Sequence, residues 1–129
     1  MAPIAAYRVL AKLKELGSVN PVIRLTKPSK EGPLKTDQDF FLIDAPFPSP
    51  LLTKADVTPG KEVNGKTGGW EVETLATTIK QIPGVLEVGL FVGPTGLQAQ
   101  AQGRVGGQKP IAAYFGKPDG SVLVRKAPE

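Results

Sequence analysis

Asp37, Asp39 and Asp44 are the acidic residues whose spacing comes nearest to a chemical site. In an extended strand, Asp37 and Asp39 would point to one face and Asp44 to the other. Carboxylates spaced in this way could bind a cation or supply a general base. The same residues also suit a turn and a strand end, where Asp37 would accept hydrogen bonds from nearby backbone N–H groups. We expect this structural role.

Other features also admit both a chemical and a structural interpretation. Residues 103–107 read GRVGG, which is Gly-rich and basic enough to cradle a phosphate, but a strand before it and a helix after it are not predicted. Glu87 lies in an apolar segment, where burial would raise its pKa and suit it to proton transfer. We expect Glu87 instead to face solvent or to be paired. Trp70 is interpreted as an anchor for the loop before it rather than as a ligand platform.

The composition limits the chemistry that these residues can support. Cysteine and histidine are absent from the sequence, which excludes disulfides, thiolate nucleophiles and the commonest general base. The formal net charge is +4, and the basic residues are scattered among acidic ones. A nucleic-acid-binding protein usually concentrates its basic charge. We therefore expect a solvated surface and no nucleic-acid partner.

Membrane and export signals are not evident in the sequence. The longest apolar runs fall well short of the ~18 residues that a membrane span needs. The first residues lack the charged and apolar regions of a signal peptide. We expect a cytoplasmic protein without a membrane partner.

Two amphipathic helices are predicted to position the polar residues. Apolar side chains recur at helical spacing over residues 3–16 and over residues 71–82. Gly17 is a natural stop for the first helix, and Pro83 followed by Gly84 ends the second.

Short apolar and β-branched segments predict the strands. The first two are expected to pair antiparallel, and the last two to form a hairpin around a Pro-Asp-Gly turn. Loop insertions are predicted over 45–70, with Leu51 and Leu52 pinning that loop to the body, and over 93–109, the best candidate for local disorder. This order predicts an α+β fold, a ferredoxin-like βαββαβ unit without its first strand, followed by a C-terminal hairpin. The predicted strands are 21–26, 38–44, 85–92, 111–115 and 121–125.

Several stretches in this order resemble the type A ribose-5-phosphate isomerase family, especially its fungal members. Residues 32–44, GPLKTDQDFFLID, are similar to the family pattern G-P-(V)-x-T-D-x-x-N-x-I-x-D, with Asp39 where Asn is usual. Residues 84–91, GVLEVGLF, follow the helix and are similar to G-V-V-E-x-G-L-F. Residues 113–122, AYFGKPDGSV, resemble the closing segment of the family, and the first predicted helix resembles a family helix that ends in Leu-Gly.

The resemblance implies that residues 1–129 are the C-terminal part of such an isomerase. The family interconverts ribose 5-phosphate and ribulose 5-phosphate in the non-oxidative pentose phosphate pathway, without metal or cofactor. Its catalytic carboxylate, lysine and phosphate-binding groups lie in an N-terminal Rossmann-like half that has no counterpart in this sequence. We therefore carry over no catalytic, cofactor-binding or metal-ligating residue.

The part that is present resembles the small lid domain of the family, together with the terminal hairpin that joins its Rossmann-like sheet. On this basis we expect no activity from the chain alone. Partners would be further copies of the chain or a complementary N-terminal half, with sugar phosphate bound only when that half is supplied.

Two alternative functions stay open at the level of sequence. One is a non-catalytic interaction module in a larger assembly. The other is a basic nucleic-acid-binding domain, which would need exposed aromatic side chains gathered on one sheet face. Strand alternation places Phe40 and Phe41 on opposite faces, so the sequence disfavours this second alternative.

Overall fold

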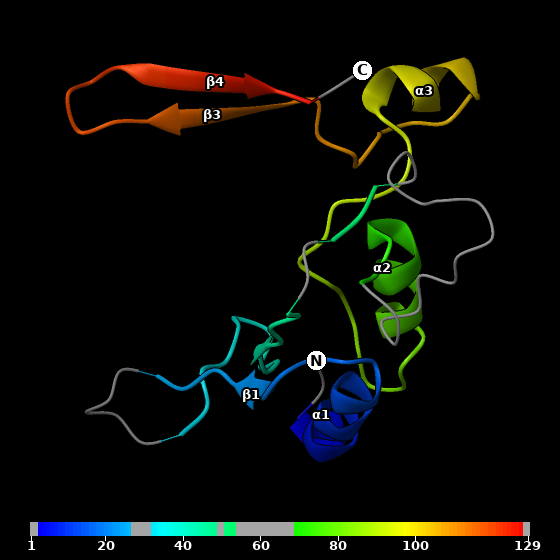
Figure 1. Ribbon diagram of the computed structural model, residues 1–129, viewed down its shortest axis with the longest axis vertical. Helices are drawn as coiled ribbons and strands as arrows, with labels where there is room; N and C mark the ends of the chain where they lie inside the picture. The colour runs from blue at the N-terminus through cyan, green and yellow to red at the C-terminus, as the bar shows by residue number, and fades with distance from the viewer. Residues whose placement is uncertain (1–2, 27–31, 49–50, 54–68, 128–129) are drawn as a thin grey trace. The chain divides into compact units, whose positions relative to one another are not determined.

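The computed structural model describes residues 3–26, 32–48, 51–53 and 69–127 (Figure 1). It divides into two compact units, unit 1 from Met1 to Gly89 and unit 2 from Leu90 to Glu129. The described residues form helices and two small antiparallel sheets of two strands each. The predicted mixed α and β class is therefore confirmed, while the ferredoxin-like arrangement stays a prediction.

Unit 1 begins with a 3-10 turn, η1 (Pro3–Ala5), that leads into helix α1 (Ala6–Glu15). Ala6, Val9 and Leu13 are its buried side chains and follow the predicted apolar stripe. Gly17 ends the helix with φ 103°. The N–H groups of Ser18 and Gly17 donate to the carbonyls of Leu13 and Lys14, both at 3.0 Å. These two bonds form the Schellman motif that a glycine stop allows.

Strands β1 (Val22–Ile23) and β2 (Ile43–Asp44) pair antiparallel, as predicted, with Val22 opposite Asp44. Both are shorter than the predicted segments 21–26 and 38–44. Isolated bridges join Leu25 to Pro33 and Lys35 to Phe41, so residues 33–35 pair with the residues after β1 and with the residues before β2.

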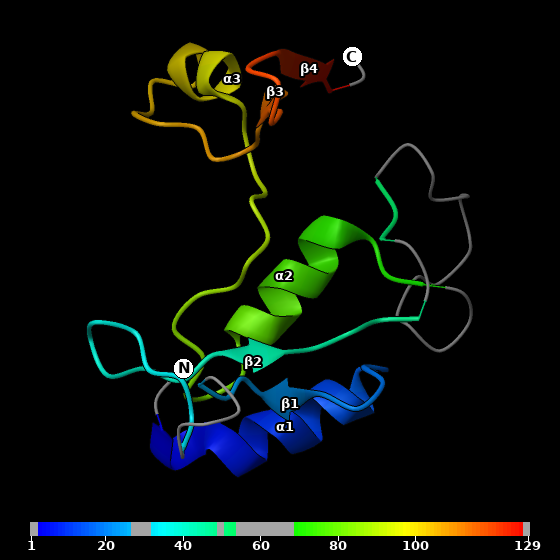
Figure 2. The same cartoon turned by 90° about the vertical axis from the view of Figure 1, so that its left-hand side faces the viewer.

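Helix α2 (Val72–Lys80) supplies the other side of the core of unit 1. Val9 and Leu13 of α1 pack with Ile82, just after α2, and with Ile43 of β2. Figure 2 shows α1, the β1–β2 pair and α2 gathered in this unit. Burying apolar area between these elements is what stabilises them, since strands of two residues have little stability of their own.

Residues 85–92 are not a strand, contrary to prediction. The chain turns at Pro83 and Gly84, where the N–H of Val85 donates to the carbonyl of Ile82 at 3.1 Å. It then continues without a paired strand among the described residues. A β-branched composition favours a strand only where a neighbouring strand accepts its hydrogen bonds. Residues 85–92 have a composition that favours a strand, but among the described residues no neighbouring strand pairs with them.

Unit 2 contains helix α3 (Gly96–Ala101) and a hairpin of strands β3 (Ala112–Gly116) and β4 (Val122–Lys126). The hairpin was predicted, and the pairs run from Ala112 opposite Lys126 to Gly116 opposite Val122. Helix α3 is not among the predicted elements, because the prediction has a loop over residues 93–109. Its N-terminus is a capping box in which Thr95 and Gln98 bond each other's backbone N–H groups, a pattern that the sequence does contain.

Much of the predicted insertion 45–70 lies outside the described residues. Its described part includes Leu52, whose N–H donates to the carbonyl of Trp70 at 2.8 Å, while Val72 donates to the carbonyl of Leu52 at 2.9 Å. These bonds tie the segment to the start of α2, as was expected of the Leu51–Leu52 pair. No helix in the described part of the chain is long and apolar enough to cross a membrane.

Candidate functional site

Asp37 and Asp39 lie in the turn of a short hairpin. The N–H of Asp39 donates to the carbonyl of Thr36, and the N–H of Thr36 to the carbonyl of Phe40, both at 2.9 Å. Asp39 has φ 62°, the left-handed conformation that ends a turn of this type. Aspartate and asparagine both tolerate this conformation. This explains why Asp39 can stand where the family pattern compared with residues 32–44 has Asn.

The side chain that accepts a local backbone bond in this turn is Thr36, whose Oγ1 receives the N–H of Phe40 at 3.1 Å. This role had been expected of Asp37. The carboxyl groups of Asp37 and Asp39 are both exposed. Water therefore competes with any ligand at these two carboxylates.

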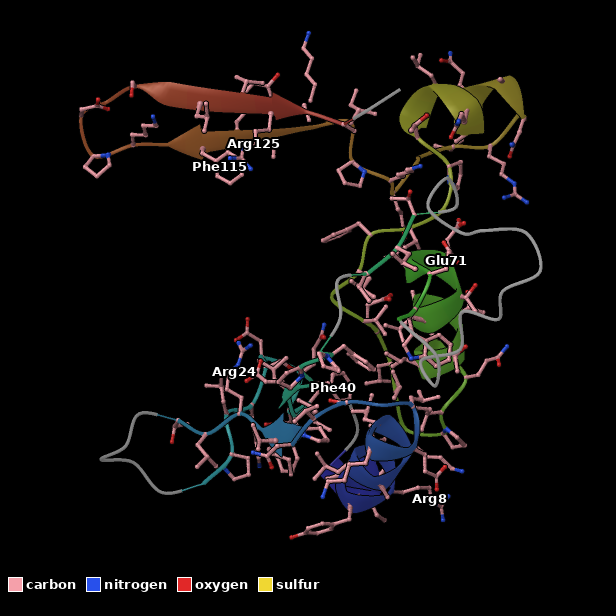
Figure 3. The ribbon with its side chains drawn as sticks, in the orientation of Figure 1. Arg8, Arg24, Phe40, Glu71, Phe115 and Arg125 are labelled. Carbon is pink, nitrogen blue, oxygen red and sulfur yellow. The ribbon has the colours of Figure 1, made fainter. Side chains whose placement is uncertain are left out.

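Asp44 is engaged by Arg24 across the β1–β2 pair. The Arg24 Nε donates to Oδ2 of Asp44 at 2.9 Å, and Nη2 donates to Oδ1 at 2.5 Å. This paired geometry is the one in which guanidinium and carboxylate bond most strongly. The hydrogen bond from Arg24 holds the pKa of Asp44 below its ordinary value. Figure 3 marks Arg24 near this strand pair.

The three aspartates do not meet in a metal site. Within residues 3–26, 32–48, 51–53 and 69–127, no group of three or more acidic or other ligating side chains could hold a metal ion. Asp37 and Asp39 occupy a turn, and Asp44 is held by its arginine partner.

Glu87 is exposed and paired, as expected. Its carboxylate accepts the N–H of Val88 at 3.1 Å and forms an ion pair of 3.1 Å with Nζ of Lys80. The backbone bond from Val88, with help from Lys80, lowers the pKa of Glu87. A buried general base would need the opposite shift. The lowered pKa makes Glu87 a weaker base than an ordinary glutamate.

The glycines of residues 103–107 shape the chain around α3. Gly103 has φ 70° and donates its N–H to the carbonyl of Gln100, while Arg104 donates to the carbonyl of Ala99. Gly103 thus ends α3 in a Schellman motif. At Gly107, a Cβ atom would collide with the backbone of Thr95. These contacts show that Gly103 and Gly107 are needed for the folding of unit 2. A bound phosphate is not required to explain them.

Trp70 anchors the start of α2 to the end of α1, while most of the loop that it is predicted to anchor lies outside the described residues. Its ring is buried, and Nε1 donates to the carbonyl of Leu16 at 2.7 Å. The neighbouring Glu71 is a residue whose role the sequence did not reveal. Its buried carboxylate accepts the N–H groups of Glu73 and Thr74 and the hydroxyl of Thr74, so it caps α2.

The β3–β4 hairpin is the feature of the described chain that most resembles a binding surface. Its register puts Tyr114 and Val124 on one face, and Phe115 and Leu123 on the other. All four side chains are exposed, Tyr114 by 74%. A hairpin with two apolar faces is marginally stable in water by itself. Figure 3 marks Phe115 and Arg125, which lie on the two strands.

Comparison with known proteins defines the class. A family model described as ribose 5-phosphate isomerase A (phosphoriboisomerase A) matches residues 1–103. The chain belongs to this family.

Several relatives that it matches are called ribose-5-phosphate isomerase. The one from Schizosaccharomyces pombe is 35% identical over 97% of this chain, and the one from Mycosarcoma maydis is 33% identical over 98%. Each match covers 33% of the relative's own length. The relative from Dictyostelium discoideum is 32% identical over 97% of this chain and 40% of its own. This chain thus spans about a third of the curated relatives that it matches. No solved structure matches it.

Proposed function

We propose that this chain forms one structural part of a ribose-5-phosphate isomerase and is inactive alone. The observation that carries the proposal is the match along nearly the whole chain to about a third of each relative. The reaction would be the interconversion of ribose 5-phosphate and ribulose 5-phosphate in the pentose phosphate pathway, in the cytoplasm.

Asp37, Asp39, Asp44 and Glu87, all among the described residues, lack the environment of a catalytic base. An aldose–ketose isomerase must remove a proton next to a carbonyl, which calls for a carboxylate whose pKa lies near the working pH. The pKa values of Asp44 and Glu87 are instead lowered by their partners. Asp37 and Asp39 are exposed in a turn. We propose that the base comes from the part of an isomerase that this chain does not span.

The role proposed for the chain is positioning. Unit 1 would act as the small lid domain, completed to a ferredoxin-like sheet, and residues 45–70 would form an insertion on its surface. Unit 2 would supply the hairpin that joins a larger sheet. Its exposed apolar faces support this role, because burying them would stabilise an assembly with the rest of an isomerase or with further copies.

A chimera tests the proposal directly. Residues 1–129 replace the matched third of the S. pombe relative, and conversion of ribose 5-phosphate is assayed for the chimera and for the purified chain alone. We expect activity from the chimera and none from the chain alone. Asp37→Asn and Asp39→Asn in the chimera should leave the rate unchanged. Activity of the chain alone would contradict the proposal and return attention to Asp37, Asp39 and Glu87. A folded but inactive chimera would contradict the proposal that this chain serves as the matched third of an isomerase.

The exposed hairpin also favours a second function, a non-catalytic interaction module in a larger assembly. This function predicts a defined complex that forms at low protein concentration without restoring isomerase activity. Analytical ultracentrifugation of the chain, alone and with its co-purifying proteins, would measure it. A monomer that captures no specific partner would exclude this second function.

A further inference from the structure

Residues 94–109, the closed loop of unit 2, return to the point where they leave the chain (Figure 1). The N–H groups of Gln108 and Lys109 both donate to the carbonyl of Pro94, at 3.1 Å and 3.2 Å. A Cβ atom at Gly107 would collide with the backbone at the start of the loop, so the two ends lie in contact. Compact surface loops with joined ends are frequently functional.

The interior of the closed loop is filled by a small side chain, while larger apolar side chains point outward. Ala99 of α3 is fully buried, whereas Leu97 is exposed by 77% and Val105 is fully exposed. Apolar side chains in water contribute nothing to the burial that stabilises a fold. The folding of the closed loop therefore does not account for Leu97 and Val105.

The charge of the closed loop is positive only. Acidic residues are absent from residues 88–118, and the loop carries Arg104 and Lys109. Both side chains are exposed, and neither forms an ion pair within the described part of the chain. In unit 1, by contrast, α1 and α2 each pair a lysine with a glutamate. Unpaired cations beside exposed apolar side chains favour an acidic partner.

The two cationic residues lie at opposite ends of α3. The N–H of Arg104 donates to the carbonyl of Ala99 near the end of the helix, and that of Lys109 donates to Pro94, just before its start. The six residues of this helix span about 9 Å. About three residues of an extended chain cover the same length. Carboxylates about three residues apart on an extended segment would therefore match the two cations.

We propose that the closed loop is a docking surface for an extended acidic segment of a partner protein. Carboxylates of that segment meet Arg104 and Lys109, and its apolar side chains contact Leu97 and Val105. The proposal does not rest on the isomerase function, because it concerns a partner of the folded chain. It also names a surface that is separate from the β3–β4 hairpin.

Other occupants match the closed loop less closely. Small molecules bind in concave sites, whereas full exposure places Val105 on a protruding surface. Nucleic acids call for a dense basic patch with aromatic side chains, and the loop has two cations and no aromatic residue. A second copy would bring like charges together, since the chain carries a net charge of +4.

A peptide titration of the isotope-labelled full chain, followed by NMR, tests the proposal. The probe is a synthetic peptide of about ten residues that repeats Glu-Leu-Ser, and its matched control repeats Gln-Leu-Ser. We expect saturable shifts of the amide signals of residues 97–109, with a dissociation constant below about 1 mM that rises with salt. The glutamine peptide should bind at least about tenfold more weakly.

Three outcomes of this titration would overturn the proposal. They are the absence of saturable shifts in residues 97–109, equal binding of the two peptides, and tighter binding of a single-stranded DNA oligonucleotide at the same residues. The last outcome would assign the surface to nucleic acid.

Paired charge substitutions separate a defined surface from general attraction. Arg104→Gln with Lys109→Gln should weaken binding of the glutamate peptide at least about tenfold. Arg8→Gln with Lys14→Gln removes two exposed cations from α1 and should change the affinity by less than about twofold. The bonds that close the loop join backbone groups, so unchanged amide signals of the free variants will show that the loop is kept. Equal losses in the two double variants would contradict the proposal.

The chimera with the S. pombe relative tests the last alternative, that the rest of an isomerase covers the closed loop. We expect the glutamate peptide to bind the chimera as it binds the chain, and Arg104→Gln with Lys109→Gln to leave the isomerase rate unchanged. Loss of peptide binding in a folded chimera would overturn the proposal. A folded, inactive chimera that still binds the peptide would contradict the proposed function and leave the docking surface standing. An active chimera that does not bind the peptide would do the reverse.

Discussion

Gly84 lies where the turn after α2 meets the start of α1. Its φ is 98°, and a Cβ atom at this position would collide with the Cβ of Ala5. Gly84→Ala would therefore combine backbone strain with a steric clash, and we expect it to lower the free energy of unfolding by about 2–4 kcal/mol. Urea denaturation followed through Trp70, the single tryptophan of the chain, measures this loss in unit 1.

Gly32 provides the matched control for the clash. It has φ 104°, but a Cβ atom at this position would meet nothing within 4 Å among the described residues, apart from its chain neighbours, so Gly32→Ala carries mainly the strain. We expect it to cost about 1–2 kcal/mol. Equal losses for the two glycines would show that Ala5 moves aside freely, and would contradict close packing of the turn on α1.

The Arg24–Asp44 pair predicts a pH dependence. The pKa of Asp44 is lowered in the folded chain by the hydrogen bond from Arg24, so in acid the unfolded chain binds the proton more readily. The stability that this pair contributes is complete above the ordinary aspartate pKa and is lost as pH falls through the lowered one. We expect the difference in stability between wild type and Arg24→Gln to be constant above about pH 5 and to shrink in more acid solution.

An NMR titration of the Asp44 carboxyl group provides the direct measurement. Its pKa should rise in Arg24→Gln and stay unchanged in Lys12→Gln, since Lys12 pairs with Glu15 on the surface of α1. If the pKa of Asp44 does not change when Arg24 is replaced, the hydrogen bond from Arg24 is not the cause of the lowered pKa.

At the scale of elements, helix α2 depends on the cap that Glu71 provides. The carboxylate accepts the N–H of Glu73 at 3.0 Å and that of Thr74 at 2.8 Å, and it also receives the Thr74 hydroxyl. Glu71→Ala leaves these donors without that acceptor at a buried position, and we expect it to lower the free energy of unfolding by about 1–2 kcal/mol. Urea denaturation measures this loss. Glu73→Ala, in the same first turn, should cost less than about 1 kcal/mol. A larger loss at Glu73 would contradict the capping role of Glu71.

The helices show how far local patterns suffice to predict elements. Helix α1, its Gly17 stop and the β3–β4 hairpin could be predicted because the signals for each lie within a few residues of one another. The capping box of Thr95 and Gln98 is an equally local signal for the start of α3, although the surrounding glycines favour a loop.

Strand pairing and side-chain partners could not be predicted so well, because they depend on distant residues. Residues 85–92 have the composition of a strand, but pairing needs a neighbour that no local pattern supplies. The partner of Asp44 is twenty positions away at Arg24. That distance is why the aspartates could be singled out from the sequence but their separate roles could not be assigned.

For the whole molecule, the two units bury very different amounts of apolar surface. Among the described residues, the buried apolar side chains of unit 1 include Val9, Leu13, Trp70 and Leu75, whereas unit 2 has Ala99. A segment of about 40 residues rarely folds without added support, and a two-stranded hairpin is marginal in water. The stability of the isolated chain should therefore be unevenly distributed between the units.

Hydrogen exchange in the isolated chain measures this difference. We expect the amides inside α1 and α2 to open with free energies of several kcal/mol, set by unfolding of unit 1. The bonded hairpin amides of Ala113, Phe115, Leu123 and Arg125 should open with only about 1 kcal/mol, since little burial holds the hairpin. Urea at a concentration that leaves Trp70 buried should already abolish their protection. Equal protection in both units would contradict this prediction, because it would show that unit 2 gains its stability within the isolated chain and has no need of a further sheet.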